Sequence, residues 1–144
     1  MAPIRLSPTE VQVHGIVYMF SDVDIADDFE AYWYQSGEKI VGPDNFIALN
    51  RNYPGVHKIQ CLNYQHSYDQ WEHVDHVSTQ VSIKSSMPDG KKIELFAISF
   101  FEIEDDLIKS AVEYWAESYP APEWRRKYVK PLGEDLASLR NSAV

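Results

Sequence analysis

Several features are scarce or missing in this chain of 144 residues. Cys61 is the only cysteine, which excludes an intrachain disulfide and a zinc site built on several thiolates, and agrees with a reducing compartment. No apolar run approaches the roughly 20 residues of a membrane-spanning helix. The opening stretch MAPIRLSPTEVQVHG also lacks the basic start and apolar core of a signal peptide. We therefore expect a cytoplasmic protein with no membrane partner.

Basic residues are also scarce. The chain has 13 lysines and arginines against 22 aspartates and glutamates, which gives a formal net charge of -9. A field of that sign repels polyanions, so the composition predicts no nucleic-acid partner and no binding to anionic membrane surfaces. The plainer interpretation is that the acidic excess keeps the protein in solution.

The common signatures of nucleotide cofactors and covalent catalysis are missing. The chain contains no Gly-x-Gly-x-x-Gly, no Gly-Lys-Ser/Thr phosphate loop and no Gly-x-Ser-x-Gly elbow. Cys61 lies in an apolar stretch without an activating neighbour in sequence. We therefore expect no cofactor and no covalent nucleophile.

What is present is typical of a globular chain. Hydrophobic residues make up 44% and aromatic residues 13% of the sequence, which is enough apolar surface to offset the entropy cost of ordering a chain. The length suits a single domain spanning residues 1–144. Pro120 and Pro122 mark the start of a C-terminal extension, residues 120–144.

The first third of the chain has helical signals. Ser7, with Glu10 three residues later, forms a capping box, and the apolar spacing that follows predicts a helix ending near Ser21. A later helix, which includes Phe46, must end before Pro54. Between them we expect a helical turn or loop and then a strand with a hairpin return: Asp24 to Phe29, Glu30 to Gln35, and Lys39 to Val41.

From His57 onward the apolar spacing changes to a period of two. Short turn sequences separate the runs, including Met87-Pro88-Asp89-Gly90, so successive strands should form an antiparallel meander. Helices before a long sheet indicate an α+β domain with the helices on one face. The expected strands are His57 to His66, Trp71 to Lys84, Lys91 to Ile103 and Leu107 to Tyr119. After them we expect a short helix at Glu123 to Tyr128, and at Glu134 to Arg140 either another helix or a frayed tail.

A group of histidines raises the question of a metal site. His73, Asp75 and His76 occur in WEHVDH, and His66 lies one predicted strand earlier. Imidazoles with a carboxylate suit zinc or iron, but neighbouring strand residues point to opposite faces, so Asp75 and His76 do not easily share one ion. We predict solvated or hydrogen-bonded side chains and no metal.

The stretch SAVEYWAESYPAPEW places Glu113 among aromatic residues. A carboxylate desolvated among rings has a raised pKa and can exchange protons near neutral pH. Against this, one face of a regular strand would carry Lys109, Ala111, Glu113, Trp115 and Glu117. Periodicity therefore favours a wet face, with Glu113 paired to a lysine across the sheet.

Two stretches resemble a known family. QSGEKIVGPDNFIALN, and later ISFFEIEDDLIKSAVEYWAESY followed by PAPEWR, are similar to the nuclear transport factor 2-like superfamily, and within it to the SnoaL-like group of small bacterial proteins. The resemblance covers about Asp27 to Arg126. It implies a cone, in which a strongly curved antiparallel sheet wraps around N-terminal helices and encloses a mostly apolar pocket. It also implies homodimers formed through the sheet.

The family includes polyketide cyclases, ketosteroid isomerase, scytalone dehydratase and limonene epoxide hydrolase, together with non-catalytic binding domains. The hydrolase spacing, counted from Ile108, puts Glu113 where that enzyme has a catalytic Asp, whereas alignment on the tryptophan would put Tyr114 there. The hydrolase also needs an Arg-x-Asp, and those positions hold Gln80 and Ser82. Epoxide hydrolysis is therefore disfavoured, and Gln80 and Ser82 either bind a ligand or face solvent.

Two further members offer partial matches. Tyr18 is a counterpart for the oxyanion-hole tyrosine of ketosteroid isomerase, although its base cannot be aligned. His73, His76 and Asp75 are a loose analogy to scytalone dehydratase, without matching spacing.

The sequence thus leaves two hypotheses. One is a cofactor-independent isomerase, cyclase or lyase, with Glu113 as general acid or base for cyclisation, isomerisation or dehydration of a small apolar, oxygenated molecule. The other is a ligand-binding or dimerisation domain of the same fold with no chemistry. The residues expected to bind the substrate are Tyr18, Trp33, Gln35, Gln80, Ser82 and Trp115.

Overall fold

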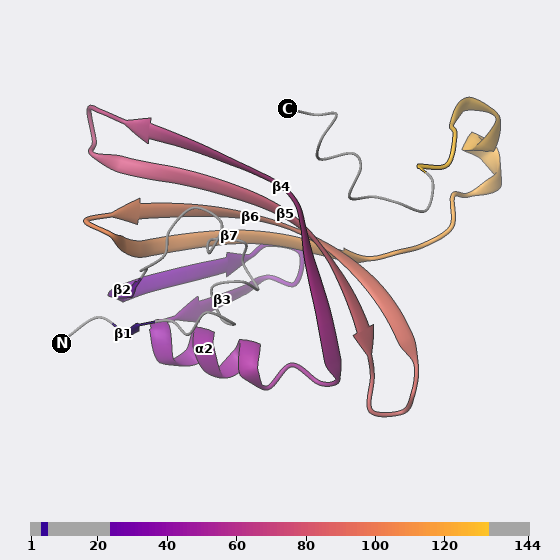
Figure 1. Cartoon of the computed structure of the whole chain (residues 1–144), viewed down its shortest axis with the longest axis horizontal. Helices are drawn as coiled ribbons and strands as arrows, with labels where there is room; N and C mark the ends of the chain where they lie inside the picture. Colours follow the sequence, from indigo (N-terminus) through magenta and orange to yellow (C-terminus); the bar gives the residue numbers. More distant parts are fainter. Residues whose placement is uncertain (1–3, 6–23, 133–144) are drawn as a thin grey trace.

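A computed structural model describes residues 4–5 and 24–132 of the chain. They form a curved, seven-stranded sheet that stays open and has one helix beneath it (Figure 1). The strand order is β1-β2-β7-β6-β5-β4, and β3 pairs with β2 beside this path. The elements are β1 (Ile4–Arg5), β2 (Asp24–Trp33), β3 (Glu38–Val41), α2 (Pro43–Arg51), β4 (Val56–Asp69), β5 (Val74–Ser86), β6 (Lys92–Glu104), β7 (Leu107–Glu117) and the 3-10 helix η2 (Glu123–Tyr128).

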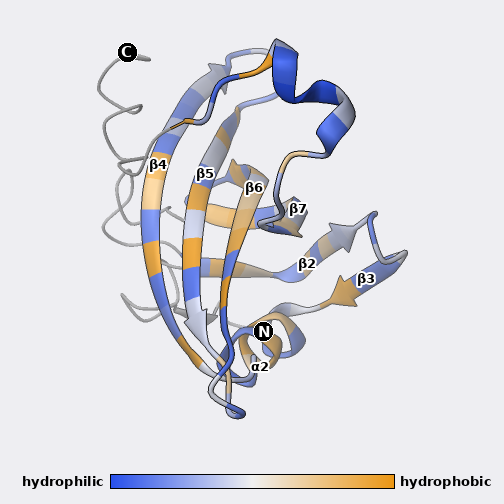
Figure 2. Cartoon of the chain, turned by 90° about the vertical axis from the view of Figure 1, so that its right-hand side faces the viewer, coloured by the Kyte–Doolittle hydropathy of each residue, from blue (hydrophilic) through white to orange (hydrophobic). Residues whose placement is uncertain are grey.

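The four long strands β4 to β7 form the predicted antiparallel meander. The expected alternation is clearest in β5, where Val77, Thr79 and Val81 are buried on the concave side of the sheet. Figure 2 shows the corresponding hydrophobic and hydrophilic bands along β4 and β5. A two-residue turn joins β6 to β7, and both of its residues, Asp105 and Asp106, have positive φ, as a type I′ hairpin requires.

The long strands do not lie flat. Figure 1 shows β4, β5 and β6 curving toward α2 at the end nearest the β5–β6 turn. A register shift between Cys61 and Asn63 places a bulge in β4, and a bulge bends its strand. The curvature produces the concave surface that holds the candidate site.

The stretch from Asp24 to Phe29 corrects one expectation, because it is the first half of strand β2 and not a helical turn or loop. β2 pairs in parallel with β7, so the sheet is mixed and not purely antiparallel. A register shift between Ile25 and Glu30 interrupts the alternation: Ile25, Ala26 and Phe29 are all buried. This irregular spacing is why the period of two was not recognisable in the sequence.

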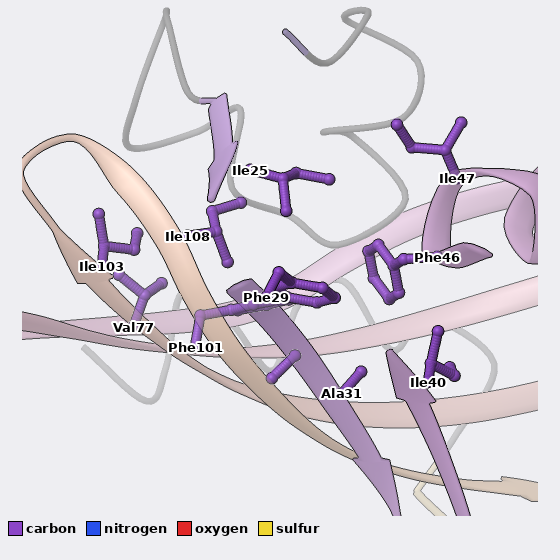
Figure 3. Packing of buried hydrophobic residues seen from close by; sticks show 11 residues of the cluster. Ile25, Phe29, Ala31, Ile40, Phe46, Ile47, Val77, Phe101, Ile103 and Ile108 are labelled. Atoms are coloured by element: carbon purple, nitrogen blue, oxygen red, sulfur yellow. The ribbon is translucent and has the colours of Figure 1, made fainter. Parts of the chain in front are cut away.

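Helix α2 covers the concave face with Phe46 and Ile47. The Phe46 ring lies 4.8 Å from that of Phe29 on β2, centroid to centroid. Burying one such ring stabilises the fold by about 1.5–3 kcal/mol. Figure 3 shows this core, whose members are Ile25, Phe29, Ala31, Ile40, Phe46, Ile47, Val77, Phe101, Ile103, Ile108 and Ala111.

The chain leaves the sheet after Glu117, and the predicted short helix at Glu123–Tyr128 is present as η2. The predicted helix from Ser7 to Ser21, which carries Tyr18, and the one at Glu134 to Arg140 lie outside the described residues. None of the helices in the described part of the chain is both long and apolar enough to cross a membrane.

Candidate functional site

Glu113 lies in the wall of a cavity of about 130 Å³ on the concave side of the sheet. The cavity is partly open and is bordered by the bent strands, by the end of β2, and by the end of α2 with the loop that follows it. Its lining is mostly apolar, with a few polar groups. The lining residues are Trp33, Leu49, Asn50, Tyr53, His57, Ile59, Val81, Ile83, Leu95, Ala97, Ser99, Glu113 and Trp115.

The Glu113 side chain is 7% exposed, which corrects the expectation of a solvated strand face. Ser99 Oγ donates a hydrogen bond to Glu113 Oε2 at 2.7 Å, and Trp33 Nε1 donates one to Oε1 at 3.2 Å. The residue directly opposite Glu113 on β6 is therefore a serine and not the expected lysine.

The reason for this error is a bulge near the start of β7. Ile103 pairs with Ile108 and Glu102 pairs with Ser110, so Lys109 is the extra residue between them. It forms an ion pair with Asp28, at 3.2 Å, away from Glu113. The strict alternation assumed from the sequence therefore fails at Lys109 and holds only from Ala111 onward.

Two tryptophans flank the carboxylate. Trp33 comes from the end of β2 and Trp115 from β7, and their rings meet edge to face with centroids 6.1 Å apart. Gln35 Oε1 accepts a hydrogen bond from the backbone N–H of Trp115 at 2.5 Å. Of the predicted site residues, Glu113, Trp33 and Trp115 thus line one cavity, and Gln35 holds Trp115 from outside it.

The other predicted site residues do not join this group. Gln80 is exposed, and Ser82 is buried on the same side of β5 as Gln80. Their neighbours Val81 and Ile83 line the cavity, so alternation turns Gln80 and Ser82 to the opposite face of the sheet. Tyr18 lies outside the described residues.

Sequence reasoning missed the polar groups that share the cavity with Glu113. The signal for Ser99 was its place in β6 between the inward-facing Ala97 and Phe101. The signal for His57 was its place in β4 two residues before Ile59, which lines the same cavity. Its Nδ1 lies 2.6 Å from Ser85 Oγ, and its ring meets that of Tyr53 edge to face at 4.8 Å.

The histidines of the candidate metal group have separate partners. His66 Nε2 lies 2.5 Å from Asp75 Oδ1, whereas His73 Nδ1 lies 2.9 Å from the Tyr68 hydroxyl. His76 Nδ1 is 4.0 Å from Glu102. Within residues 4–5 and 24–132, no group of three or more His, Cys, Asp or Glu side chains is placed to hold a metal ion.

Neither a protein-family model nor a curated protein sequence matches the chain significantly. Solved structures do. A suggested ketosteroid isomerase from Kribbella flavida has a TM-score of 0.55 and 24% identity, over 78% of this chain and 75% of its own. The fold is nuclear transport factor 2-like.

Two further structures illustrate the range of proteins with this nuclear transport factor 2-like fold. The hexachlorocyclohexane dehydrochlorinase LinA-type3 of Novosphingobium barchaimii has a TM-score of 0.53 and 14% identity, over 68% of this chain and 77% of its own. The third structure is a protein from Catenulispora acidiphila with a ketosteroid isomerase-like fold, in complex with trimethylamine. It has a TM-score of 0.51 and 10% identity, over 76% of this chain and 86% of its own. These likenesses show the fold that the sequence predicted and no particular activity.

Proposed function

We propose that the cavity binds one small, mostly apolar molecule and that Glu113 exchanges a proton with it. The observation that carries the proposal is a carboxylate only 7% exposed, held by Ser99 and Trp33 in the wall of an apolar cavity. A small number of fixed polar groups in an apolar pocket is typical of ligand sites. Membership of the SnoaL-like group and a cytoplasmic location stay predictions.

The proposed chemistry is acid-base catalysis on an oxygenated substrate. Glu113 would remove a proton from the carbon next to a carbonyl or hydroxyl-bearing centre, and its carboxylic acid would return that proton to a second position, or to a leaving hydroxyl. Return of the proton to another carbon is isomerisation, and its transfer to a leaving hydroxyl, which departs as water, is dehydration. In a cyclisation the carbanion attacks a second carbonyl of the same molecule, the C=O π bond opens, and the proton goes to the oxygen of that carbonyl. Ser99 and Trp33 would fix the carboxylate toward the substrate. Epoxide hydrolysis remains disfavoured, because Gln80 and Ser82 replace the required Arg-x-Asp and face away from the cavity.

Proton exchange can be measured without knowing the natural substrate. Cyclohexanone is small enough for the cavity, and loss of its α-proton signal in D₂O, followed by NMR, reports carbon deprotonation directly. We expect the wild-type protein to accelerate the exchange and Glu113→Gln to abolish the acceleration. Glu102→Gln is a matched control, because Glu102 is an exposed acid on the opposite side of the sheet. Equal exchange in wild type and Glu113→Gln would remove Glu113 from the chemistry.

A binding domain without chemistry is the second candidate, and it is favoured by the exposed Ile98, Phe100 and Tyr114. These side chains share the convex face of β6 and β7 and are 42%, 50% and 39% exposed. We propose that a second copy of the chain covers them in a homodimer. Light scattering should then give twice the mass of the 16.6 kDa chain. Phe100→Glu should reduce it to that of a monomer, and a wild-type monomer at high micromolar concentration would exclude the dimer.

The trimethylamine complex of the Catenulispora protein belongs to that protein. It supports including small amines beside ketones and alcohols when ligands are tested on this chain.

A further inference from the structure

The cavity around Glu113 combines a buried carboxylate, tryptophan rings and a small volume. We infer that the cavity also binds a small organic ammonium ion with methyl-sized substituents, and binds it more tightly than a neutral molecule of the same shape. This inference rests on the proposed function in one respect, that the cavity is a ligand site centred on Glu113. It differs in the charge of the ligand, because the substrate proposed above is neutral.

The first argument is the position of the carboxylate, which is held in the cavity wall. Both Glu113 oxygens accept hydrogen bonds from neutral donors, one from Ser99 Oγ and one from Trp33 Nε1. Electrostatic attraction is stronger where water is excluded, so a cation in the cavity would interact strongly with this carboxylate.

The second argument is the aromatic lining. Trp33 and Trp115 flank Glu113, and Tyr53 lines the same cavity from the loop after α2. The face of an aromatic ring attracts cations, and indole attracts them most. Rings combined with a carboxylate recognise alkylammonium groups, which carry a diffuse positive charge on an apolar surface. A neutral ketone or alcohol gains nothing comparable from these rings.

The third argument is size. An apolar cavity of roughly 150 Å³ accepts benzene, so the 130 Å³ here suits a molecule of about five to seven non-hydrogen atoms. The remaining walls, which include Val81, Leu95 and Ala97, offer methyl groups an apolar surface. Hard inorganic cations favour several carboxylate or carbonyl oxygens, and Glu113 is the only carboxylate among the described lining residues. The net charge of -9 also attracts cations toward the protein.

The test compares two probes of the same shape. Choline and 3,3-dimethylbutan-1-ol differ in having a quaternary nitrogen or a quaternary carbon, so their difference in affinity measures the charge alone. By titration calorimetry we expect choline to bind at least about tenfold more tightly than the alcohol. Tetrabutylammonium, which carries the same charge on a much larger body, should not bind. Equal affinity for choline and the alcohol, or binding of tetrabutylammonium as tight as that of choline, would overturn the inference.

Variants separate the contribution of the carboxylate to choline binding from that of the aromatic rings. Glu113→Gln should lower the affinity for choline by more than about 30-fold and change the affinity for the alcohol by less than about threefold. Trp115→Leu should lower the affinity for choline by about three- to 30-fold, and Trp115→Phe should lower it by less. The matched control is Trp71→Leu, since Trp71 is exposed in the turn between β4 and β5 and does not line the cavity. Thermal unfolding of every variant checks that it is folded. Unchanged choline binding in folded Glu113→Gln would contradict the inference.

The two proposals can fail separately. If cyclohexanone exchange depends on Glu113 while choline does not bind, the ammonium inference is wrong and the proposed chemistry stands. If choline binds with the expected dependence while no exchange occurs, the inference stands and the acid-base proposal is wrong.

Discussion

Ser99 on β6 and Glu113 on β7 lie directly opposite each other in the sheet and are joined by a hydrogen bond of 2.7 Å. Both side chains are buried, at 3% and 7% exposure. The pairing of the strands thus supplies a donor to the carboxylate at the position where it lines the cavity. Because the strands fix this geometry, the bond needs no ligand to form.

Removing the serine hydroxyl should therefore destabilise the fold. Ser99→Ala deletes a hydrogen bond to a buried charged group, which is worth about 1.5–3 kcal/mol. We expect a loss of that size in the free energy of urea unfolding at neutral pH, with the m-value unchanged. A loss below about 0.5 kcal/mol would show that the hydroxyl is not a significant partner of Glu113.

Thr79 provides the opposite case on the neighbouring strand. It pairs with Ser99 in the sheet and is 1% exposed, but its Oγ1 has no hydrogen-bond partner among the described residues. Thr79→Val removes this polar atom and keeps the shape, so the unfolding free energy should stay equal or rise by about 1 kcal/mol. A marked destabilisation in the same urea assay would reveal a partner for that hydroxyl.

Gly55 is required by a close approach of two backbones. Its φ is +96°, and a Cβ atom there would lie 2.5 Å from the carbonyl oxygen of Ser86 on the paired strand. Gly90 also has positive φ, at +86°, but a Cβ there meets nothing within 4 Å. Both Gly→Ala changes incur the conformational strain, and only Gly55→Ala adds the clash.

We therefore expect Gly55→Ala to lower the free energy of unfolding by about 1–3 kcal/mol more than Gly90→Ala does. Thermal or urea unfolding of the two variants measures the difference. Equal effects would mean that the β4–β5 strand pair adjusts at Gly55 without cost.

Asp69 makes stability depend on pH. Backbone N–H groups of Glu72 and Trp71 donate to its carboxylate, at 3.1 and 2.9 Å for Oδ1, and lower the pKa of Asp69. A pKa lowered by folding contributes stability above the unfolded value of about 3.9, and that contribution is lost as the pH falls through the folded value. Asp69→Asn removes the charge and keeps an oxygen acceptor.

Wild type should therefore be more stable than Asp69→Asn at pH 7, and the gap should close as the pH is lowered below about 4. Urea unfolding of both proteins between pH 7 and pH 3 measures this difference in the free energy of unfolding. Glu72→Gln, which removes an exposed acid in the same turn, is the control and should show no such gap. A gap for Asp69→Asn that stays constant with pH would contradict the role of the charge.

Local sequence signals predicted many of the elements. The alternation from His57 onward predicted the meander of β4 to β7, and the turn sequences placed its hairpins within a few residues. The helix around Phe46 and the helical turn at Glu123–Tyr128 were also predicted correctly. These features depend on contacts between near neighbours in sequence, so a short window contains the information.

The faces of the strands were harder to predict wherever a bulge intervenes. In β2 the register shift between Ile25 and Glu30 breaks the alternation, so the first half of the strand was not predicted. In β7 the extra residue Lys109 led to the wrong prediction that Glu113 lies on a solvated face. A single inserted residue moves every later side chain to the other face, and the energy that selects it comes from the partner strand.

The sequence by itself determined the sheet, the helix beneath it and, through family spacing, the residue most worth testing. Only the tertiary structure decided that Glu113 is buried. Trp33 donates to it from 80 residues away and Ser99 from across the sheet, while His57 lines the same cavity from the start of β4. Such contacts depend on strand register and curvature, which are set by the packing of the whole sheet against α2 and which no local pattern of residues encodes.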